Sequence, residues 1–391
     1  MSRTESLSTR VDRVRSTSSG DDARRTNGPG YAILGVGEYL PPHVRDNSWW
    51  GRSAETRRPS STCMPDLPGS VFDGQRGRPI ADDDDLAARQ RVFMARCAED
   101  RFRGTRERRV CGPDLPSSTM EIRAARAALS DAGVGAEDLD AIVVASMPGD
   151  HYCPNNATAI LEALGCRSIP CFAVESACTS FLSGLAQLHG LLALHGLRHG
   201  LIVVSVQYSQ LTAPDDRLYR SVGDGAGAAV VGPVSPGDGL LSHVLLGHPQ
   251  WRDAVRCSTR DGERFISGRS PIWGHTCDDT ASRELIMNCS RLARDSVALA
   301  LDRAGLDARE VSHFFCHQAT GWMSEACQAA CGLDCAQRHD TFPRFANMGA
   351  ANLPVNMTQA KRAGDLRPGD VVATFSIGMG VTTAASVMRW T

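Results

Sequence analysis

Short apolar runs and segments whose large residues recur at helical spacing alternate along most of the chain. Strand-like runs lie at 31–37, 139–145, 169–174, 201–206, 228–231, 311–316 and 370–376, and helical spacing marks 120–132, 181–192, 284–304 and 349–362. Strand, helix and strand in this order predict right-handed parallel crossovers and an α/β fold of layered sheets. The second half repeats the layout of the first, which predicts an internal duplication.

A cysteine stands where one strand-like run passes into a helical segment. Residues 169–174 are apolar, and the large residues after them recur at helical spacing, namely Phe181, Leu182, Leu185, Leu188 and Leu192. Cys178 lies between, where the unpaired N–H groups and positive dipole end of a first helical turn favour a thiolate. We expect Cys178 to be a nucleophile; the alternative is a small buried hydrophobic residue, the usual role of an unpaired cysteine.

Composition divides the chain into a tail and two halves. Residues 1–29 are rich in Ser, Arg, Thr, Gly and Asp and predict a disordered tail. Two α/β halves are expected at 30–233 and 234–391. Within the first half, residues 43–90 are polar and interrupted by Pro and Gly, which indicates an insertion that forms a surface lobe.

Charge and hydropathy exclude several classes of protein. The 391 residues carry a net charge of −2, which argues against a nucleic-acid surface. We expect no membrane-spanning segment and no signal peptide, and therefore a cytoplasmic protein. Its 14 cysteines are then expected as thiols. The densest set, Cys327, Cys331 and Cys335, lacks a Cys-x-x-Cys pair or nearby histidine ligands, so no metal site is predicted.

Two local patterns are candidate sites for phosphate-bearing ligands. Residues 101–109 concentrate basic side chains, beginning with Arg101 and Arg103, and form either a solvated charged run or a patch that meets a phosphate-bearing carrier. Residues 221–231 are rich in glycine but lack the terminal Lys-Ser/Thr of a phosphate loop and the dinucleotide pattern. We expect those glycines to allow close backbone packing ahead of strand 228–231, and no bound nucleotide.

Two further polar residues lie where an α/β sheet collects its chemistry. His317 directly follows the strand-like run 311–316, and Asn347 precedes the helical segment 349–362. Ligands and catalytic groups gather at the carboxyl ends of such strands. Taken singly, each has a structural alternative: a histidine at a strand end, or an asparagine in a turn.

Several stretches containing these residues resemble one family. They are Ala177-Cys178-Thr-Ser-Phe-Leu-Ser-Gly, His317-Gln-Ala-Thr, Ala346-Asn347-Met-Gly-Ala-Ala-Asn-Leu-Pro354, Gly223-Asp-Gly-Ala-Gly-Ala-Ala, Gly378-Met-Gly, Ala32-Ile-Leu-Gly-Val-Gly-Glu-Tyr-Leu-Pro-Pro and Gly104-Thr-Arg-Glu-Arg-Arg. Taken in their order along the chain, they resemble the ketoacyl-synthase III type of condensing enzyme in the thiolase superfamily. The resemblance runs from about residue 31 to the end.

The resemblance implies a five-layered αβαβα fold built from two duplicated halves, a homodimer, and ping-pong acyl transfer through a cysteine thioester. Cys178 would then be the nucleophile. The N–H groups of Cys178, Met379 and Gly380 would form the oxyanion hole. His317 and Asn347 would donate hydrogen bonds to the carbonyl of an extender thioester, so that loss of carbon dioxide leaves a stabilised enolate. Coenzyme A or acyl-carrier-protein thioesters would be the substrates, with no permanently bound cofactor.

The chain departs from the family pattern at three positions. The usual continuation His-Gln-Ala-Asn-x-Arg is replaced here by Thr320 and Trp322, at the carrier entrance with Arg101 and Arg103. Cys153 stands where the family often has a phenylalanine inserted into the partner's acyl pocket, so a longer or bulkier acyl group is expected. These departures favour an enzyme of polyketide or other specialised metabolism over a housekeeping starter enzyme.

Three functions remain open. The first is decarboxylating condensation onto a malonyl-type thioester, which Asn347 favours. The second is transfer of the acyl group from Cys178 to a hydroxyl, amine or carrier thiol without decarboxylation, which Thr320 and Trp322 favour. The third is an inactive scaffold subunit of a synthase, against which the retention of cysteine, histidine and asparagine argues.

Overall fold

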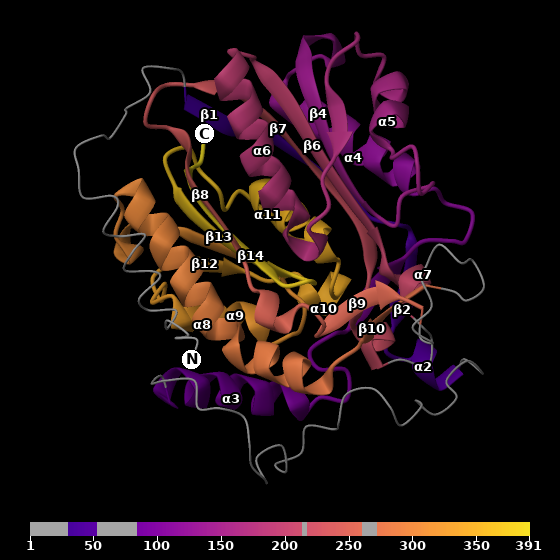
Figure 1. Ribbon diagram of the computed structural model, residues 1–391, viewed down its shortest axis with the longest axis vertical. Coiled ribbons are helices and arrows are strands. Elements are labelled where there is room, and N and C mark those ends of the chain that lie inside the picture. The colour runs from indigo at the N-terminus through magenta and orange to yellow at the C-terminus, as the bar shows by residue number, and fades with distance from the viewer. Residues whose placement is uncertain (1–29, 53–83, 213–216, 260–271) are drawn as a thin grey trace, which may run out of the picture.

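The computed structural model describes residues 30–52, 84–212, 217–259 and 272–391 (Figure 1). The predicted tail at 1–29 lies outside the described residues, as does most of the predicted insertion at 43–90.

The first half of the fold is built on a five-stranded sheet of order β1-β7-β6-β4-β5. Its strands are β1 (Gly30–Tyr39), β4 (Leu139–Met147), β5 (Cys171–Ala173), β6 (His199–Gln207) and β7 (Asp224–Val234). The β4–β5 and β4–β6 pairs are parallel, whereas β7 runs antiparallel to both β6 and β1. The predicted crossovers are therefore confirmed, and the sheet is mixed.

The second half repeats this sheet strand for strand, in the order β8-β14-β13-β11-β12. Its strands are β8 (Gly239–Gly247), β11 (His313–Cys316), β12 (Gln337–His339), β13 (Val371–Gly378) and β14 (Thr382–Arg389). Again the β11 pairs are parallel and the β14 pairs antiparallel. The matching order and directions confirm the predicted duplication.

Helices complete five layers (Figure 1). The outer helices are α4 (Ser117–Ala132) and α5 (Ala157–Leu164) on the first sheet, and α8 (Asp279–Ala304) and α9 (Met323–Ala330) on the second. Two equivalent helices, α6 (Ser180–His195) and α11 (Asn352–Ala363), lie between the sheets. The αβαβα fold class is confirmed.

The central helix α6 corrects one expectation about membranes. The stretch Ala177–His195 is long and apolar enough to cross a bilayer, so the prediction that no segment has this length and composition was wrong. Most of it is buried in the fold, where α6 contacts β4 and β6 of one sheet and β8 and β14 of the other. Its uncharged sequence is explained by contact with a sheet on each side.

The glycine-rich stretch lies inside a strand rather than ahead of it, because β7 begins at Asp224. A Cβ built on Gly227 would lie 2.5 Å from the Pro354 ring of α11. Because Gly227 has no side chain, the central helix α11 packs directly on the sheet. This agrees with the expected close backbone packing of these glycines.

Smaller elements cover one end of the sandwich. They are β2 (His43–Asp46) paired with β3 (Glu107–Val110), β9 (Val255–Ser258) paired with β10 (Trp273–Thr276), and the helices α2 (Trp49–Arg52), α3 (Asp84–Ala98), α7 (Tyr208–Leu211) and α10 (Phe342–Phe345). Single 3-10 turns, among them η2 (Ala177–Thr179) and η7 (Gly349–Ala351), precede the central helices.

The described ends of the 43–90 stretch belong to the body of the protein and do not form a separate lobe. Trp50 is buried and packs edge-on against Tyr219. Gln90 of α3 is buried against α8, where its amide donates to the Ile286 carbonyl at 2.7 Å and accepts from the Ser290 N–H at 3.0 Å. These are the two groups that an α-helix pairs with each other, so Gln90 bonds into the turn 286–290 of α8.

Candidate active site

Cys178 lies in η2, the tight turn that joins β5 to α6, as the periodicity predicts. The preceding Ala177 has a φ of 51°, a backbone conformation that costs free energy for a residue with a side chain. The end of β13 packs on this turn: a Cβ built on Gly378 would lie 2.5 Å from the Ser176 carbonyl oxygen and 3.2 Å from the Cys178 nitrogen. Only glycine therefore fits at 378 without moving the turn.

The Cys178 thiol is buried, and its sulfur lies 3.4 Å from the Tyr208 hydroxyl. Burial raises the pKa of Cys178 to about 11, although the hydrogen bond with Tyr208 acts in the opposite direction. The expected stabilisation of a thiolate by the helix start is thus outweighed by burial. With its pKa raised in this way, we expect Cys178 to be mostly a thiol at neutral pH.

His317 and Asn347 come from the second half of the fold and contact each other. His317 follows β11, and its Nε2 lies 3.2 Å from Asn347 Oδ1. The Gly349 N–H also donates to Oδ1, at 2.8 Å, which fixes which branch of the amide is oxygen. Nε2 must therefore carry the proton, and Asn347 Nδ2 is left as a donor on the other branch.

Burial lowers the pKa of His317 to about 4, although the hydrogen bond with Asn347 raises it. The imidazole is therefore neutral at pH 7. Its Nε2–H and the Asn347 amide are two uncharged hydrogen-bond donors on adjacent side chains.

One cavity of about 230 Å³ joins these residues. Cys178, His317, Asn347 and Tyr208 all line it, although they lie far apart in the chain. The remaining walls are mainly apolar side chains from α8, β9 and the segment after β13, including Leu285, Ile286, Val255, Met379 and Val381. Cys178, His317 and Asn347, which were expected to share one buried pocket, all line this cavity.

The predicted oxyanion-hole residues are placed unequally. Met379 lines the cavity. Gly380 does not line it and adopts a φ of 90°, with open space where a side chain would stand. Gly378, one residue earlier than Met379, makes the closest approach to the Cys178 turn.

The predicted entrance residues meet at one place. Thr320 and Trp322 line the cavity, and the Thr320 hydroxyl is buried without a hydrogen-bond partner among the described residues. A Cβ built on Gly321, between them, would lie 2.4 Å from the Arg103 carbonyl oxygen. Arg101 and Arg103 are exposed on the outer side of this contact.

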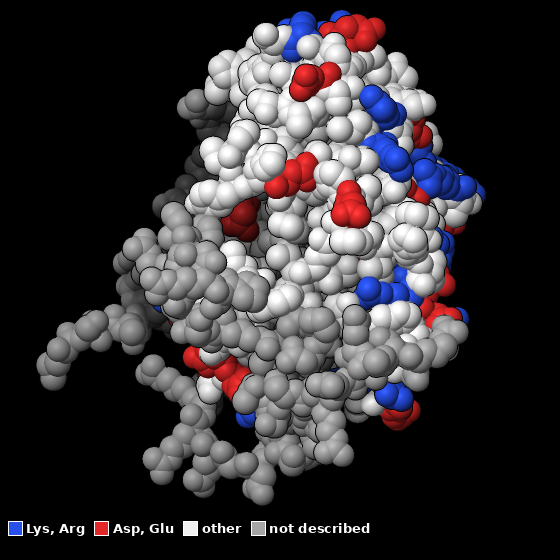
Figure 2. All heavy atoms as spheres, turned by 90° about the vertical axis from the view of Figure 1, so that its right-hand side faces the viewer, with Lys and Arg blue, Asp and Glu red and all other residues white. Residues whose placement is uncertain are grey.

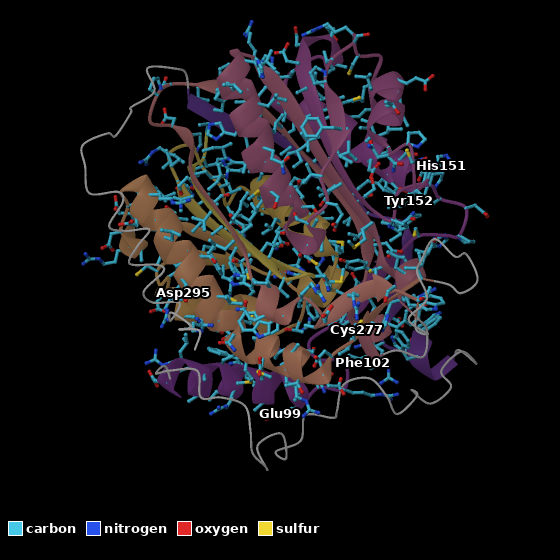
Figure 3. The ribbon with its side chains drawn as sticks, viewed as in Figure 1. Glu99, Phe102, His151, Tyr152, Cys277 and Asp295 are labelled. Atoms are coloured by element: carbon cyan, nitrogen blue, oxygen red, sulfur yellow. The ribbon has the colours of Figure 1, made fainter. Side chains whose placement is uncertain are left out.

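Cys153 is exposed and does not line the cavity of its own chain. In Figure 3 its neighbours His151 and Tyr152 lie at the outer edge of the molecule. They are well apart from Cys277, which directly follows β10, one of the two strands of the β9–β10 ribbon that lines the cavity. A role for Cys153 in an acyl pocket therefore requires a second subunit.

The cavity-lining residues that were not predicted from the sequence include Tyr208 and Cys257. Tyr208 follows an apolar strand, and Cys257 lies in β9 with its pKa raised to about 11 by burial. A tyrosine after an apolar run is typical of core, so no local signal distinguished it. Within the described residues no group of three His, Cys, Asp or Glu side chains is placed to hold a metal ion.

A duplicated five-layer fold that brings a cysteine from one half to a histidine and an asparagine from the other is that of the thiolase superfamily, and this chain is one of its condensing enzymes. The profile of 3-oxoacyl-[acyl-carrier-protein] synthase III matches residues 172–247, and that of its C-terminal part matches residues 301–390. A β-ketoacyl-[acyl-carrier-protein] synthase III of Bacillus pumilus is 32% identical over 288 residues, which cover 73% of this chain and 88% of that protein. The chain belongs to the 3-oxoacyl-[acyl-carrier-protein] synthase III family.

Two further relatives extend the match. The acetoacetyl CoA synthase NphT7 of Streptomyces sp. (strain CL190) is 28% identical over 363 residues, covering 92% of this chain and 98% of that one. The crystal structure of the synthase III from Aquifex aeolicus superposes with a TM-score of 0.72 at 21% identity, covering 92% of this chain and all of that one.

Proposed function

We propose that this enzyme accepts an acyl group on Cys178 and condenses it, with decarboxylation, onto a malonyl-type thioester. The observation that carries the proposal is the pair of neutral donors, His317 Nε2–H and the Asn347 amide, on the same cavity as the Cys178 thiol.

In the first half-reaction the Cys178 sulfur attacks the thioester carbonyl of the acyl donor. The new S–C bond forms, the donor's C–S bond breaks, and the cysteine proton ends on the departing carrier sulfur. N–H groups near Cys178 and Met379 would hold the oxyanion, a contact worth roughly 2.7–4 kcal/mol per donor.

In the second half-reaction His317 and Asn347 would bind the carbonyl oxygen of the malonyl-type thioester. As carbon dioxide leaves, charge develops on that oxygen, and donors already in place lower the energy of the enolate. The enolate carbon then attacks the acyl-Cys178 carbonyl, and the cysteine sulfur departs. A neutral imidazole suits this role because it keeps its Nε2–H throughout the physiological pH range. That N–H lies 3.2 Å from Asn347 Oδ1 here and would turn to the substrate oxygen on binding.

The relatives' names include acyl-carrier-protein and CoA, and we propose thioesters of these two carriers as the substrate classes here. The mainly apolar walls of the cavity favour an apolar acyl chain, in keeping with a role in specialised metabolism. The exposed Arg101 and Arg103 near Thr320 would meet the carrier's phosphate.

We also propose a homodimer that completes the acyl pocket with Cys153. Tyr152 is 82% exposed, which is unusual for a large aromatic residue. Most of the face that carries this loop and α5 is uncharged, with a few scattered acidic side chains and basic ones gathered along one edge (Figure 2). Such a face can meet its own copy without strong repulsion.

Simple acyl transfer is the second candidate, and Thr320 and Trp322 are the observation that favours it. Both line the cavity where the family pattern has asparagine and arginine. An inactive scaffold is the weakest candidate, since such a subunit does not require three chemically active side chains on one buried cavity.

Two measurements test the proposal. Intact mass after incubation with acyl-coenzyme A or acyl-carrier donors should increase by one acyl group in the wild type and in Cys257→Ala, a matched cysteine of the same cavity, but not in Cys178→Ala. Labelled malonyl donor should then release carbon dioxide in step with product. Product without carbon dioxide would establish acyl transfer instead, and label on another cysteine would overturn the assignment.

A further inference from the structure

Tyr208 is the one side chain among the described residues whose hydroxyl lies within hydrogen-bond reach of the Cys178 sulfur. The O–S distance is 3.4 Å, and both side chains are buried. Neither His317 nor Asn347 bonds to the sulfur here; His317 Nε2 is engaged with Asn347 instead. Among the described residues, the side chain that hydrogen-bonds to the reacting sulfur is therefore a phenol from the first half of the fold.

The fold holds this hydroxyl in place from two sides. Tyr208 begins α7 directly after β6, where its carbonyl accepts the Thr212 N–H at 2.8 Å. A Cβ built on Gly349 would lie 2.5 Å from the Tyr208 oxygen, so the absence of a side chain at 349, beside the Asn347 turn, makes room for the hydroxyl. The ring packs in the main hydrophobic cluster.

The chemistry of the site requires a donor at the sulfur. A thiol must lose its proton to attack a thioester, and the same sulfur must depart as an anion when the acyl group leaves. Burial disfavours that anion, and a hydrogen bond to the charged form favours it. Burial also raises the pKa of Tyr208 well above its ordinary value, so its O–H remains available as a donor.

We infer that Tyr208 is a further catalytic residue, whose O–H donates a hydrogen bond to the Cys178 sulfur as the thioester forms and again as it breaks. This inference rests on the proposed acylation of Cys178. Tyr208 keeps its own proton in both steps: the cysteine proton passes to the departing carrier sulfur in the first, and in the second the departing cysteine thiolate takes one proton from solvent. The tyrosine changes the stability of the anion, not the balance of the reaction.

The test uses alkylation of Cys178 by iodoacetamide as a function of pH, which needs no acyl substrate. Tyr208→Phe removes one oxygen atom and should shift the alkylation profile upward by about one pH unit, equivalent to a tenfold loss of thiolate at fixed pH. Acyl-Cys178 formation should slow by at least tenfold. A merely structural tyrosine would not move the alkylation profile.

Tyr31→Phe is the matched control. Its buried hydroxyl donates to the Leu197 carbonyl at 2.7 Å, beside the other end of α6. This variant should leave both readouts unchanged. If Tyr208→Phe fails to fold, 3-fluorotyrosine at position 208 keeps the hydroxyl as a stronger donor and should shift the profile downward.

The possible outcomes separate the inference from the proposed function. An unshifted or lowered alkylation profile in Tyr208→Phe means that the tyrosine does not donate to the sulfur, and overturns the inference. A wild-type protein that is alkylated at Cys178 but never acylated would overturn the proposed function while leaving the donor role intact.

Discussion

The turn before α6 and the turn before α11 occupy equivalent places in the two halves, and each brings one polar side chain to the cavity. Ala177 precedes Cys178 with a φ of 51°, and Ala346 precedes Asn347 with a φ of 57°. Each turn also receives a glycine from the opposite half. Gly378 follows this pattern at the Cys178 turn, and a Cβ on Gly223 would lie 2.2 Å from the Phe345 carbonyl oxygen at the Asn347 turn.

The two turns differ in how their side chains are held. Asn347 is held mainly by backbone groups: its N–H donates to the Ser221 carbonyl, its carbonyl accepts the Gly223 N–H, and its side-chain oxygen accepts from the Gly349 N–H as well as from His317 Nε2. The Cys178 sulfur has a hydrogen bond with a side chain, the Tyr208 hydroxyl. The duplicated backbone thus places a firmly held amide donor, Asn347, on one turn. On the other turn it places a nucleophile, Cys178, whose acidity depends on a neighbouring side chain.

Removing each polar side chain should separate the two half-reactions, with the largest effects. Cys178→Ala should abolish both the acyl adduct and the product. Asn347→Ala should retain the adduct, because the thiol is untouched, but lower the rate of condensation roughly 100- to 1000-fold, the usual cost of one lost donor to an oxyanion. Intact mass and product assays measure the two steps. An Asn347→Ala enzyme that no longer acylates would show that the turns are not independent.

The glycines that pack on the turns should give smaller effects on the same steps. In Gly378→Ala the new Cβ displaces the Cys178 turn, so acylation should slow by about 10- to 100-fold. In Gly223→Ala the Asn347 turn moves, and condensation should slow while acylation is retained. Overpacking should also lower the free energy of unfolding by about 1–3 kcal/mol. Gly190→Ala, in the open middle of α6, is the control and should affect neither step.

Much of this comparison was predictable from the sequence because its signals are local. The apolar run 169–174 and the helical spacing after it locate Cys178, and strand ends locate His317. Tyr208 and Gln90 were missed for a different reason. Each acts across 30 or more residues of chain, on Cys178 and on α8, and such contacts depend on how the layers meet. The thiol's raised pKa was missed because burial is a property of the assembled fold.

The two half-reactions should also respond differently to pH. Because the pKa of Cys178 is raised to about 11, its alkylation should increase about tenfold per pH unit between pH 7 and 10. Condensation from a preformed adduct depends on neutral His317, whose pKa is lowered to about 4, and should be flat from pH 5 to 8. The lowered pKa also means that the histidine's contribution to folding is complete above about pH 6.5 and is lost as pH falls toward 4. A step in condensation near pH 6.5 would contradict this assignment.

One difference between the halves outside the sheets is the length of the long outer helix, and Gln90 offers a test of what supports it. The outer helix α8 has 26 residues against 16 in α4, and Gln90 bonds to its 286–290 turn beside the cavity. Gln90→Ala should lower the free energy of unfolding by about 1–2 kcal/mol, because two buried hydrogen bonds are lost. Arg89→Ala, which removes only an exposed pair with Asp85, should cost less than about 0.5 kcal/mol. Urea unfolding of the two variants distinguishes them; equal losses would mean that Gln90 does not support α8.

The smallest expected effect concerns a hydroxyl that lacks a partner. Thr320 Oγ1 is buried beside the cavity with no hydrogen bond among the described residues, whereas Thr358 Oγ1 donates to the Pro354 carbonyl at 2.7 Å. Thr358→Val should therefore lower stability by about 1 kcal/mol and leave KM unchanged. Thr320→Val should leave stability unchanged or slightly higher, and should raise KM for the thioester by about 2- to 10-fold if the hydroxyl binds substrate. An unchanged KM would mean that the Thr320 hydroxyl does not bind the thioester.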